Sequence, residues 1–215
     1  MKLLFYYSNN DDYARRRLFY SLLSLCIPLL LILSTLFAAE ISLSGNVKYF
    51  LPIGNNRAIE YNTLKNKVIG AYGEHRNSKI RGHKHAGIDI QGNYGEMVYA
   101  IGKGTVTDIF RDFPHKTIYI RHNENGGPPF YSVYIHVEDI QVNRGDVVTE
   151  NTPIARIFTR EELQSAHFGT APHLHFEIRH NINDKGDATF KSMSISELNK
   201  YCSDPLLFFK TLSEH

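Results

Sequence analysis

The chain has 215 residues, of which 42% are hydrophobic and 21% are charged, and its formal net charge is +2 at neutral pH. This composition allows one domain of ordinary size with a packed core and a tail, and the weak net charge gives no reason to expect nucleic acid as a partner. The chain has only two cysteines, which excludes a cysteine-rich structural zinc site.

The N-terminus combines a basic cluster with a long apolar run. Arginines at 15–17 precede residues 18–39, which carry no charge. A basic flank before about 20 apolar residues is typical of an export signal or of a single anchor in the inner membrane, with the arginines kept in the cytoplasm. Cleavage after Ala39 would place the bulky Phe37 at the −3 position, so we favour an uncleaved anchor. The remaining chain is expected in the periplasm or the cell envelope.

Residues 40–67 are expected to form a connecting segment with a short strand and a turn. Beyond them, apolar and polar residues alternate in runs separated by turn signals about every ten residues, which predicts an antiparallel β protein. The expected strands are Gly87–Ile90, Met97–Ala100, Gly104–Phe110, Thr117–His122, Tyr131–His136, Pro153–Phe158 and His173–Arg179. We expect a mainly β fold, an antiparallel β-sandwich or open barrel with a groove across one sheet and few short helices, plus one hydrophobic N-terminal helix. One short helix is expected near 194–200, capped by Ser194 or Ser196.

The first of three histidine motifs pairs a histidine with an aspartate. His85 lies four residues before Asp89, and Ile88 and Ile90 alternate with the aspartate. This alternation predicts the start of a strand that points the carboxylate away from the core. Gly87 argues against a helix, so we expect a loop that leads into a strand and carries two potential metal ligands.

The other two motifs place histidines on the polar faces of apolar-backed strands. His136 follows an alternating run, and His173 and His175 share one strand face, about 7 Å apart, while Leu174 and Phe176 point into the core. Taken alone, the tandem histidines fit two exposed residues as well as they fit a metal ligand beside a proton-transfer group.

Three ligands are therefore available for one metal ion. His85, Asp89 and either His173 or His175 would supply nitrogen and oxygen atoms. Catalytic zinc sites use three protein ligands and leave one position to water, whereas structural sites close with four protein ligands. Spacing alone leaves open which of the tandem histidines binds the metal.

Together the motifs resemble the lysostaphin and LytM-type zinc endopeptidases of bacterial cell walls. The family pattern is His-x-x-x-Asp, then Tyr-x-His, then His-x-His, and this chain has these motifs at 85–89, 134–136 and 173–175. The resemblance extends from about Val68 to Phe209. It divides the chain into a signal or anchor at 1–39, a connecting segment at 40–67, a zinc endopeptidase domain at 68–209 and a tail at 210–215.

The resemblance implies one zinc ion per chain, held by His85, Asp89 and His175, with catalytic roles for His136 and His173. Zinc lowers the pKa of a bound water from about 16 toward about 7. One histidine would take the proton and pass it to the leaving amine, and the other would stabilise the oxyanion; which does which stays open. The implied reaction is amide hydrolysis in peptidoglycan peptides, either stem or cross-bridge.

Several further residues receive weaker expectations. Glu177 shares the face of His175 and could orient its ring, although a solvated carboxylate is the more common outcome. Residues 158–167 are bulkier than the glycine-rich turns of the family, and we expect a loop there that borders the cleft. Cys202 is expected to be a small buried residue. The remaining histidines are expected mostly at the surface, with His83 and His167 nearest the cleft: His75, His83, His115, His122, His167, His180 and His215.

Alternatives to an active peptidase remain open. Some family members have lost ligands and act as regulators that bind or activate other wall hydrolases, but all five site residues are present here. A closed zinc site with His83 or His167 as the fourth ligand would bind metal without turnover. Tyr49, Phe50 and Asn55-Asn56 could also reach the zinc as an inhibitory segment.

Overall fold

The computed structural model describes residues 49–76, 84–123, 127–167, 171–182 and 194–214. The signal or anchor expected at 1–39, and with it the hydrophobic N-terminal helix, lies outside the described residues. None of the helices within the described ranges has the length and apolar character that a membrane crossing requires.

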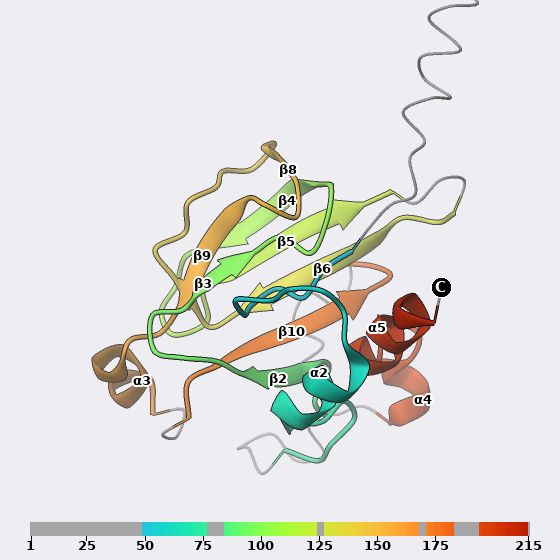
Figure 1. Ribbon diagram of the computed structural model, residues 1–215, viewed down its shortest axis with the longest axis horizontal. Helices are drawn as coiled ribbons and strands as arrows, with labels where there is room; N and C mark the ends of the chain where they lie inside the picture. The colour runs from blue at the N-terminus through green and yellow to red at the C-terminus, as the bar shows by residue number, and fades with distance from the viewer. Residues whose placement is uncertain (1–48, 77–83, 124–126, 168–170, 183–193, 215) are drawn as a thin grey trace, which may run out of the picture. The chain divides into compact units, whose positions relative to one another are not determined.

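Two antiparallel sheets dominate the described part of the chain (Figure 1). The larger has eight strands, in the order β1-β2-β10-β6-β5-β4-β8 with β11 paired to β10, and the smaller has the order β3-β9-β7. The strands are β1 (Val68–Gly70), β2 (Ile88–Gln91), β3 (Met97–Tyr99), β4 (Gly104–Phe110), β5 (Thr117–His122), β6 (Phe130–Ile135), β7 (Val137–Glu138), β8 (Val147–Val148), β9 (Pro153–Ile157), β10 (His173–Arg179) and β11 (Cys202–Ser203). The helices are α2 (Tyr61–Lys67), α3 (Arg160–Ala166), α4 (Ile195–Leu198) and α5 (Pro205–Ser213).

The expected mainly β fold with few short helices is confirmed, and the large sheet is open rather than closed into a barrel. All seven expected strands are present within one residue of their expected bounds. Alternation of apolar and polar residues located them because each strand has one face in the core. Ser194 caps α4 as expected, since its Oγ accepts a hydrogen bond from the backbone N–H of Glu197 at 3.1 Å.

The loop expected at 158–167 is instead largely helical. α3 begins after Thr159, whose hydroxyl accepts from the backbone N–H of Glu162, while the Glu162 carboxylate accepts from the backbone N–H of Thr159 at 2.7 Å. This reciprocal pair is a capping box, which satisfies two backbone donors at the helix start. The Thr-x-x-Glu spacing was the sequence signal for this helix.

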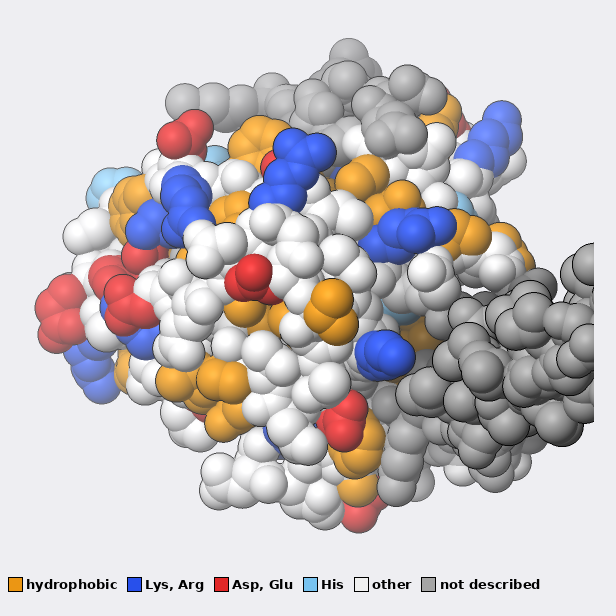
Figure 2. All heavy atoms as spheres, turned by 90° about the horizontal axis from the view of Figure 1, so that it is seen from above, with side chains coloured by type: hydrophobic (Ala, Val, Ile, Leu, Met, Phe, Trp, Pro, Cys, Tyr) orange, Lys and Arg blue, Asp and Glu red, His pale blue; other side chains and the backbone are white. Residues whose placement is uncertain are grey.

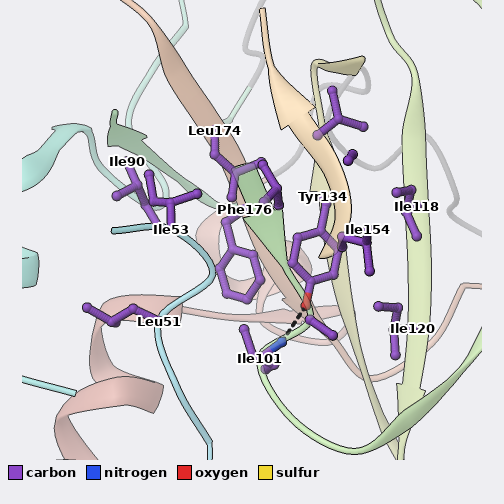
Figure 3. Packing of buried hydrophobic residues seen from close by; sticks show 14 of the residues in the cluster. Leu51, Ile53, Ile90, Ile101, Ile118, Ile120, Tyr134, Ile154, Leu174 and Phe176 are labelled. Atoms are coloured by element: carbon purple, nitrogen blue, oxygen red, sulfur yellow. Dashed lines mark hydrogen bonds between the residues drawn. The ribbon is translucent and has the colours of Figure 1, made fainter. Parts of the chain in front are cut away.

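The main core contains residues from both sheets (Figure 3). Leu174 and Phe176 of β10 pack there with Ile154 of β9, and Tyr134 of β6 accepts a hydrogen bond from the backbone N–H of Ile101 at 3.0 Å. This side of β10 is therefore the core side, and its histidines belong to the opposite face of the large sheet.

The segment that precedes α2 also enters this core. Tyr49, Leu51 and Ile53 are buried, and the Tyr49 ring packs against the rings of His122 and Phe130. The hypothesis that Tyr49 reaches a metal site as part of an inhibitory segment is therefore wrong, because its side chain packs into the core instead.

Figure 2 shows basic, acidic and hydrophobic side chains interspersed on one face, in agreement with the low net charge.

Gly87 allows β10 to approach the start of β2. A Cβ at this position would collide with the backbone carbonyl of Phe176 and would lie 2.7 Å from Cγ of Glu177. Since backbone atoms cannot yield as side chains do, we expect Gly87→Ala to lower the free energy of unfolding by about 3 kcal/mol. Chemical denaturation would measure the loss. The control is Gly95→Ser, where a Cβ meets nothing within 4 Å but φ is +70°. We therefore expect only the smaller loss of stability that a positive φ imposes on a residue other than glycine.

His122 is buried, contrary to the surface position expected for it. Its Nδ1 donates to the carbonyl of Lys103 at 2.8 Å, its Nε2 lies 2.7 Å from the Ser132 hydroxyl, and burial lowers its pKa to about 4. The unfolded chain therefore binds more protons than the folded chain below about pH 6.5. We expect His122 to lower the free energy of unfolding by about 3 kcal/mol as the pH falls from about 6.5 to about 4. Denaturation of the wild type and of His122→Asn across that range measures the effect, and equal pH slopes for the two proteins would contradict it.

Candidate metal centre

The strand register places the predicted ligands side by side. β2 and β10 pair so that Asp89 lies opposite His175, and β10 and β6 pair so that His175 lies opposite Ile135. Directly opposed residues have their Cβ atoms about 5 Å apart, so the side chains of Asp89 and His175 can meet on the outer face. His85 lies three residues before β2 and reaches the same place.

The three side chains converge on one point. Ligand atoms of His85, Asp89 and His175 all lie within 4.8 Å of one another, and all three residues are buried. His85 Nε2 lies 2.9 Å from His175 Nδ1 and 3.1 Å from Asp89 Oδ1, while His175 Nδ1 lies 3.0 Å from Asp89 Oδ1. Two imidazoles and a carboxylate in this arrangement could hold a metal ion.

Hydrogen bonds on the far side of each ring fix which nitrogen faces this point. His85 Nδ1 donates to the backbone carbonyl of Ala71 at 2.8 Å, which leaves Nε2 directed at Asp89 and His175. His175 Nε2 lies 2.8 Å from Glu177 Oε1, which leaves Nδ1 directed at His85. Partners of this kind commonly orient metal-binding histidines and fix their tautomer.

Glu177 is fully buried, so the expectation that it would be a solvated carboxylate is wrong. It lies between His175 and the buried guanidinium of Arg179, whose Nε pairs with Glu177 Oε2. Burial raises the pKa of Glu177, but Arg179 and His175 outweigh this effect and lower it well below its ordinary value. Glu177 is therefore an ionised carboxylate that positions the His175 ring.

The charges of the site favour a positive occupant. Burial opposes ionisation of Asp89, yet the hydrogen bond from His175 holds the pKa of its carboxyl well below the ordinary range. Burial also lowers the pKa of His175, but Asp89 and Glu177 outweigh it and raise the pKa to about 9. The carboxylates on both sides of His175 thus stabilise either a proton or another cation at Nδ1.

Two more histidines lie beside this group. The His136 ring centroid is 6.0 Å from those of both His173 and His175. His136 follows β6 with a left-handed φ of 63° and donates from Nδ1 to the carbonyl of Pro114 at 3.0 Å. Burial lowers its pKa to about 3, so its imidazole is neutral at neutral pH. His136 and His173 remain partly exposed whereas the other three residues are buried, so the pair faces the accessible side.

The structure also brings residues to the site that the sequence reasoning did not place there. His115, expected at the surface, is exposed but has its ring centroid 5.5 Å from that of His136. Phe113 was not placed there either, and it stacks on Phe158, a residue of the segment 158–167 expected to border the cleft, whose ring centroid lies 6.4 Å from that of His136. Arg76 contacts Asp89 and His85 directly. His115, Phe113 and Arg76 reach the site from turns or segments whose path the strand pattern does not predict.

Of the two candidates for a fourth ligand, the structure describes only His167. His167 is exposed at the end of α3 and is not a member of the His85, Asp89 and His175 group. His83 lies outside the described residues. Cys202 is buried as expected, but it also takes no part in this group.

Comparisons with known proteins concern the same part of the chain. Residues 83–187 match the sequence profile of peptidase family M23. No curated protein matches the chain.

Three solved structures are among those similar to part of this chain. The catalytic domain of the antimicrobial peptidase lysostaphin from Staphylococcus simulans is 27% identical, with a TM-score of 0.47 over 70% of this chain and 98% of that one. LytU is 26% identical, with a TM-score of 0.47 over 67% of this chain and 85% of that one. A zinc-containing peptidase from Vibrio cholerae is 24% identical, with a TM-score of 0.44 over 61% of this chain. The present chain spans only 37% of the length of the Vibrio cholerae peptidase.

Proposed function

We propose that this chain is a zinc-dependent endopeptidase, since its residues 83–187 match the model of peptidase family M23. Its substrates are amide bonds in the stem peptides or cross-bridges of peptidoglycan. The observation that supports this most strongly is the buried group of His85, Asp89 and His175 beside two partly exposed histidines. A metal-binding group next to two imidazole side chains is the combination that metal-assisted hydrolysis requires.

The donor set fits zinc. Two histidine nitrogens and one carboxylate oxygen are ligands that zinc prefers, and three protein ligands leave a coordination position for water. The ring orientations fit as well, because Ala71 and Glu177 hold the opposite nitrogens of His85 and His175. A bound zinc ion would supply an activated water and would polarise the scissile carbonyl.

We assign proton transfer to His136 and His173. His136 is neutral at neutral pH, and its Nδ1 donates to the carbonyl of Pro114, so its Nε2 can accept a proton. His173 donates from Nδ1 to the carbonyl of Ala171 at 2.9 Å, which holds its ring beside that of His136. In this proposal one ring accepts a proton from the nucleophile, and the other donates a hydrogen bond to the developing oxyanion.

The proposed substrate determines the cellular compartment in which the protein would act. Peptidoglycan lies outside the cytoplasm, so the protein must be exported, and the apolar run 18–39 after the arginines at 15–17 is the segment suited to this. We propose that this run anchors the chain in the inner membrane with the peptidase domain in the periplasm.

The test uses the purified full-length chain in mild detergent, incubated with peptidoglycan sacculi. Released fragments are identified by mass spectrometry, with and without a chelator and after zinc is restored. We expect release that the chelator abolishes and zinc restores, with a new amine and a new carboxyl end that identify the cleaved bond. Bound zinc without any cleavage, across sacculi of different cross-link chemistry, would instead support the non-catalytic regulator.

A further inference from the structure

Arg76 lies directly on the metal-binding group. Its Nη2 pairs with Asp89 Oδ2 and lies 2.7 Å from His85 Nε2. A guanidinium group has only donors, so the His85 nitrogen must be the acceptor in this contact. The same residue therefore binds two of the three proposed ligands through one nitrogen.

The contact with His85 uses a lone pair that a metal would need. Because His85 Nδ1 donates to the carbonyl of Ala71, the one lone pair of the neutral ring is on Nε2. An N–H of Arg76 and a metal ion cannot both occupy this lone pair. The two cations also repel each other, so a metal that binds His85 must displace the guanidinium.

The surrounding chain accommodates the guanidinium. A Cβ on Gly70 of β1 would collide with both Asp89 Oδ2 and Arg76 Nη2, so the glycine leaves the space in which this ion pair forms. The Arg76 side chain is 31% exposed, whereas that of Asp89 is only 11% exposed. Arg76 is therefore the more accessible partner of this ion pair.

We propose that Arg76 is an internal competitor of the metal, a cation that neutralises Asp89 and holds the His85 lone pair until zinc displaces it. The inference rests on the proposed function, since it takes His85 and Asp89 as zinc ligands. It weakens the apparent affinity for zinc, because binding must overcome the Arg76 contacts, and half-loading therefore requires a higher zinc concentration.

The opposite role for Arg76 makes the opposite prediction. If the guanidinium stayed on the outer oxygen Oδ2 of Asp89 in the loaded protein, it would orient the carboxylate and strengthen zinc binding. Removal of its charge would then weaken zinc binding. The sign of the effect on zinc affinity separates the two roles.

The experiment compares Arg76→Gln with the wild type, both as full-length chains. Arg144→Gln is the control, since it removes the same charge from an exposed position in the turn before β8, at the opposite edge of the large sheet from β2. Zinc affinity is measured by competition with a chromophoric chelator. Thermal unfolding is followed with chelator and with saturating zinc.

We expect Arg76→Gln to bind zinc about tenfold more tightly, since a nearby positive charge no longer opposes a divalent ion. Its melting temperature should fall in chelator, where Asp89 loses its partner, and should equal that of the wild type in saturating zinc. Arg144→Gln should change neither quantity.

An unchanged or weaker zinc affinity in Arg76→Gln, with zinc bound normally by the wild type, would overturn the competitor role and leave the proposed function standing. Absence of zinc binding by both proteins would overturn the proposed function and this inference with it. Zinc binding by the variant alone would support the competitor role in its strongest form.

Discussion

Asp89→Asn is expected to abolish hydrolysis and to weaken zinc binding more than a hundredfold, since even loss of a residue that merely orients a ligand costs about 10- to 100-fold. Asp89 is the one carboxylate among the three converging ligands, and the pKa of its carboxyl lies well below the ordinary range, so it is ionised at all physiological pH values. Asparagine keeps the shape but removes the negative charge that attracts a cation. Chelator competition and fragment release from sacculi measure the two losses.

The control for this change is Asp146→Asn, in an exposed turn at the other edge of the large sheet. It should leave zinc binding and hydrolysis intact. Circular dichroism should show the same secondary structure for both variants and the wild type. Retention of wild-type zinc affinity in Asp89→Asn would mean that the carboxylate is not a ligand and that the proposed site is wrong.

The sequence predicted the strands and the faces of the site well, for a simple physical reason. In β10, Leu174 and Phe176 must be buried, and this requirement alone turns His173 and His175 to the other face. The same argument turns Asp89 outward between Ile88 and Ile90. The metal roles of these residues came from the resemblance and remain predictions, but the register that brings Asp89 opposite His175 makes them physically possible.

The environment of that outer face could not be predicted from alternation. A polar strand face is normally solvated, yet Glu177 is fully buried there between His175 and Arg179. Its burial depends on close approach of the chain at Gly87, where a Cβ would lie 2.7 Å from Glu177 Cγ. Contacts of this kind join residues about 90 positions apart and leave no local periodic pattern.

Arg76 and His122 were missed for related reasons. Arg76 reaches Asp89 from an irregular segment, and no spacing rule relates the two positions. His122 lies on the same buried face of β5 as Ile118 and Ile120, so the alternation of faces along the strand indicated its burial. Its polar side chain nevertheless favoured a prediction at the surface. Hydrogen bonds to Lys103 and Ser132 compensate the burial, and only the folded chain reveals such partners.

His173→Ala is expected to reduce hydrolysis by about a hundredfold or more while zinc stays bound, because general acid–base groups contribute about 10²- to 10⁴-fold. The different effects on hydrolysis and on zinc binding follow from the position of His173. His173 lies two residues before His175 on the same strand face but is not among the three converging ligands. His136→Ala should behave in the same way, since its ring lies beside those of both His173 and His175.

The pH dependence of the two single variants can separate the roles of His136 and His173. Burial lowers the pKa of His136 to about 3, so this ring stays a neutral acceptor across the range in which an ordinary histidine titrates. An acidic limb of the rate profile near neutral pH that persists in His136→Ala and disappears in His173→Ala would separate the two roles. His180→Ala is the control, since His180 is an exposed histidine directly after β10, and its activity, zinc affinity and pH profile should match the wild type. Loss of zinc from His173→Ala would instead make His173 a ligand and overturn the assignment of His175.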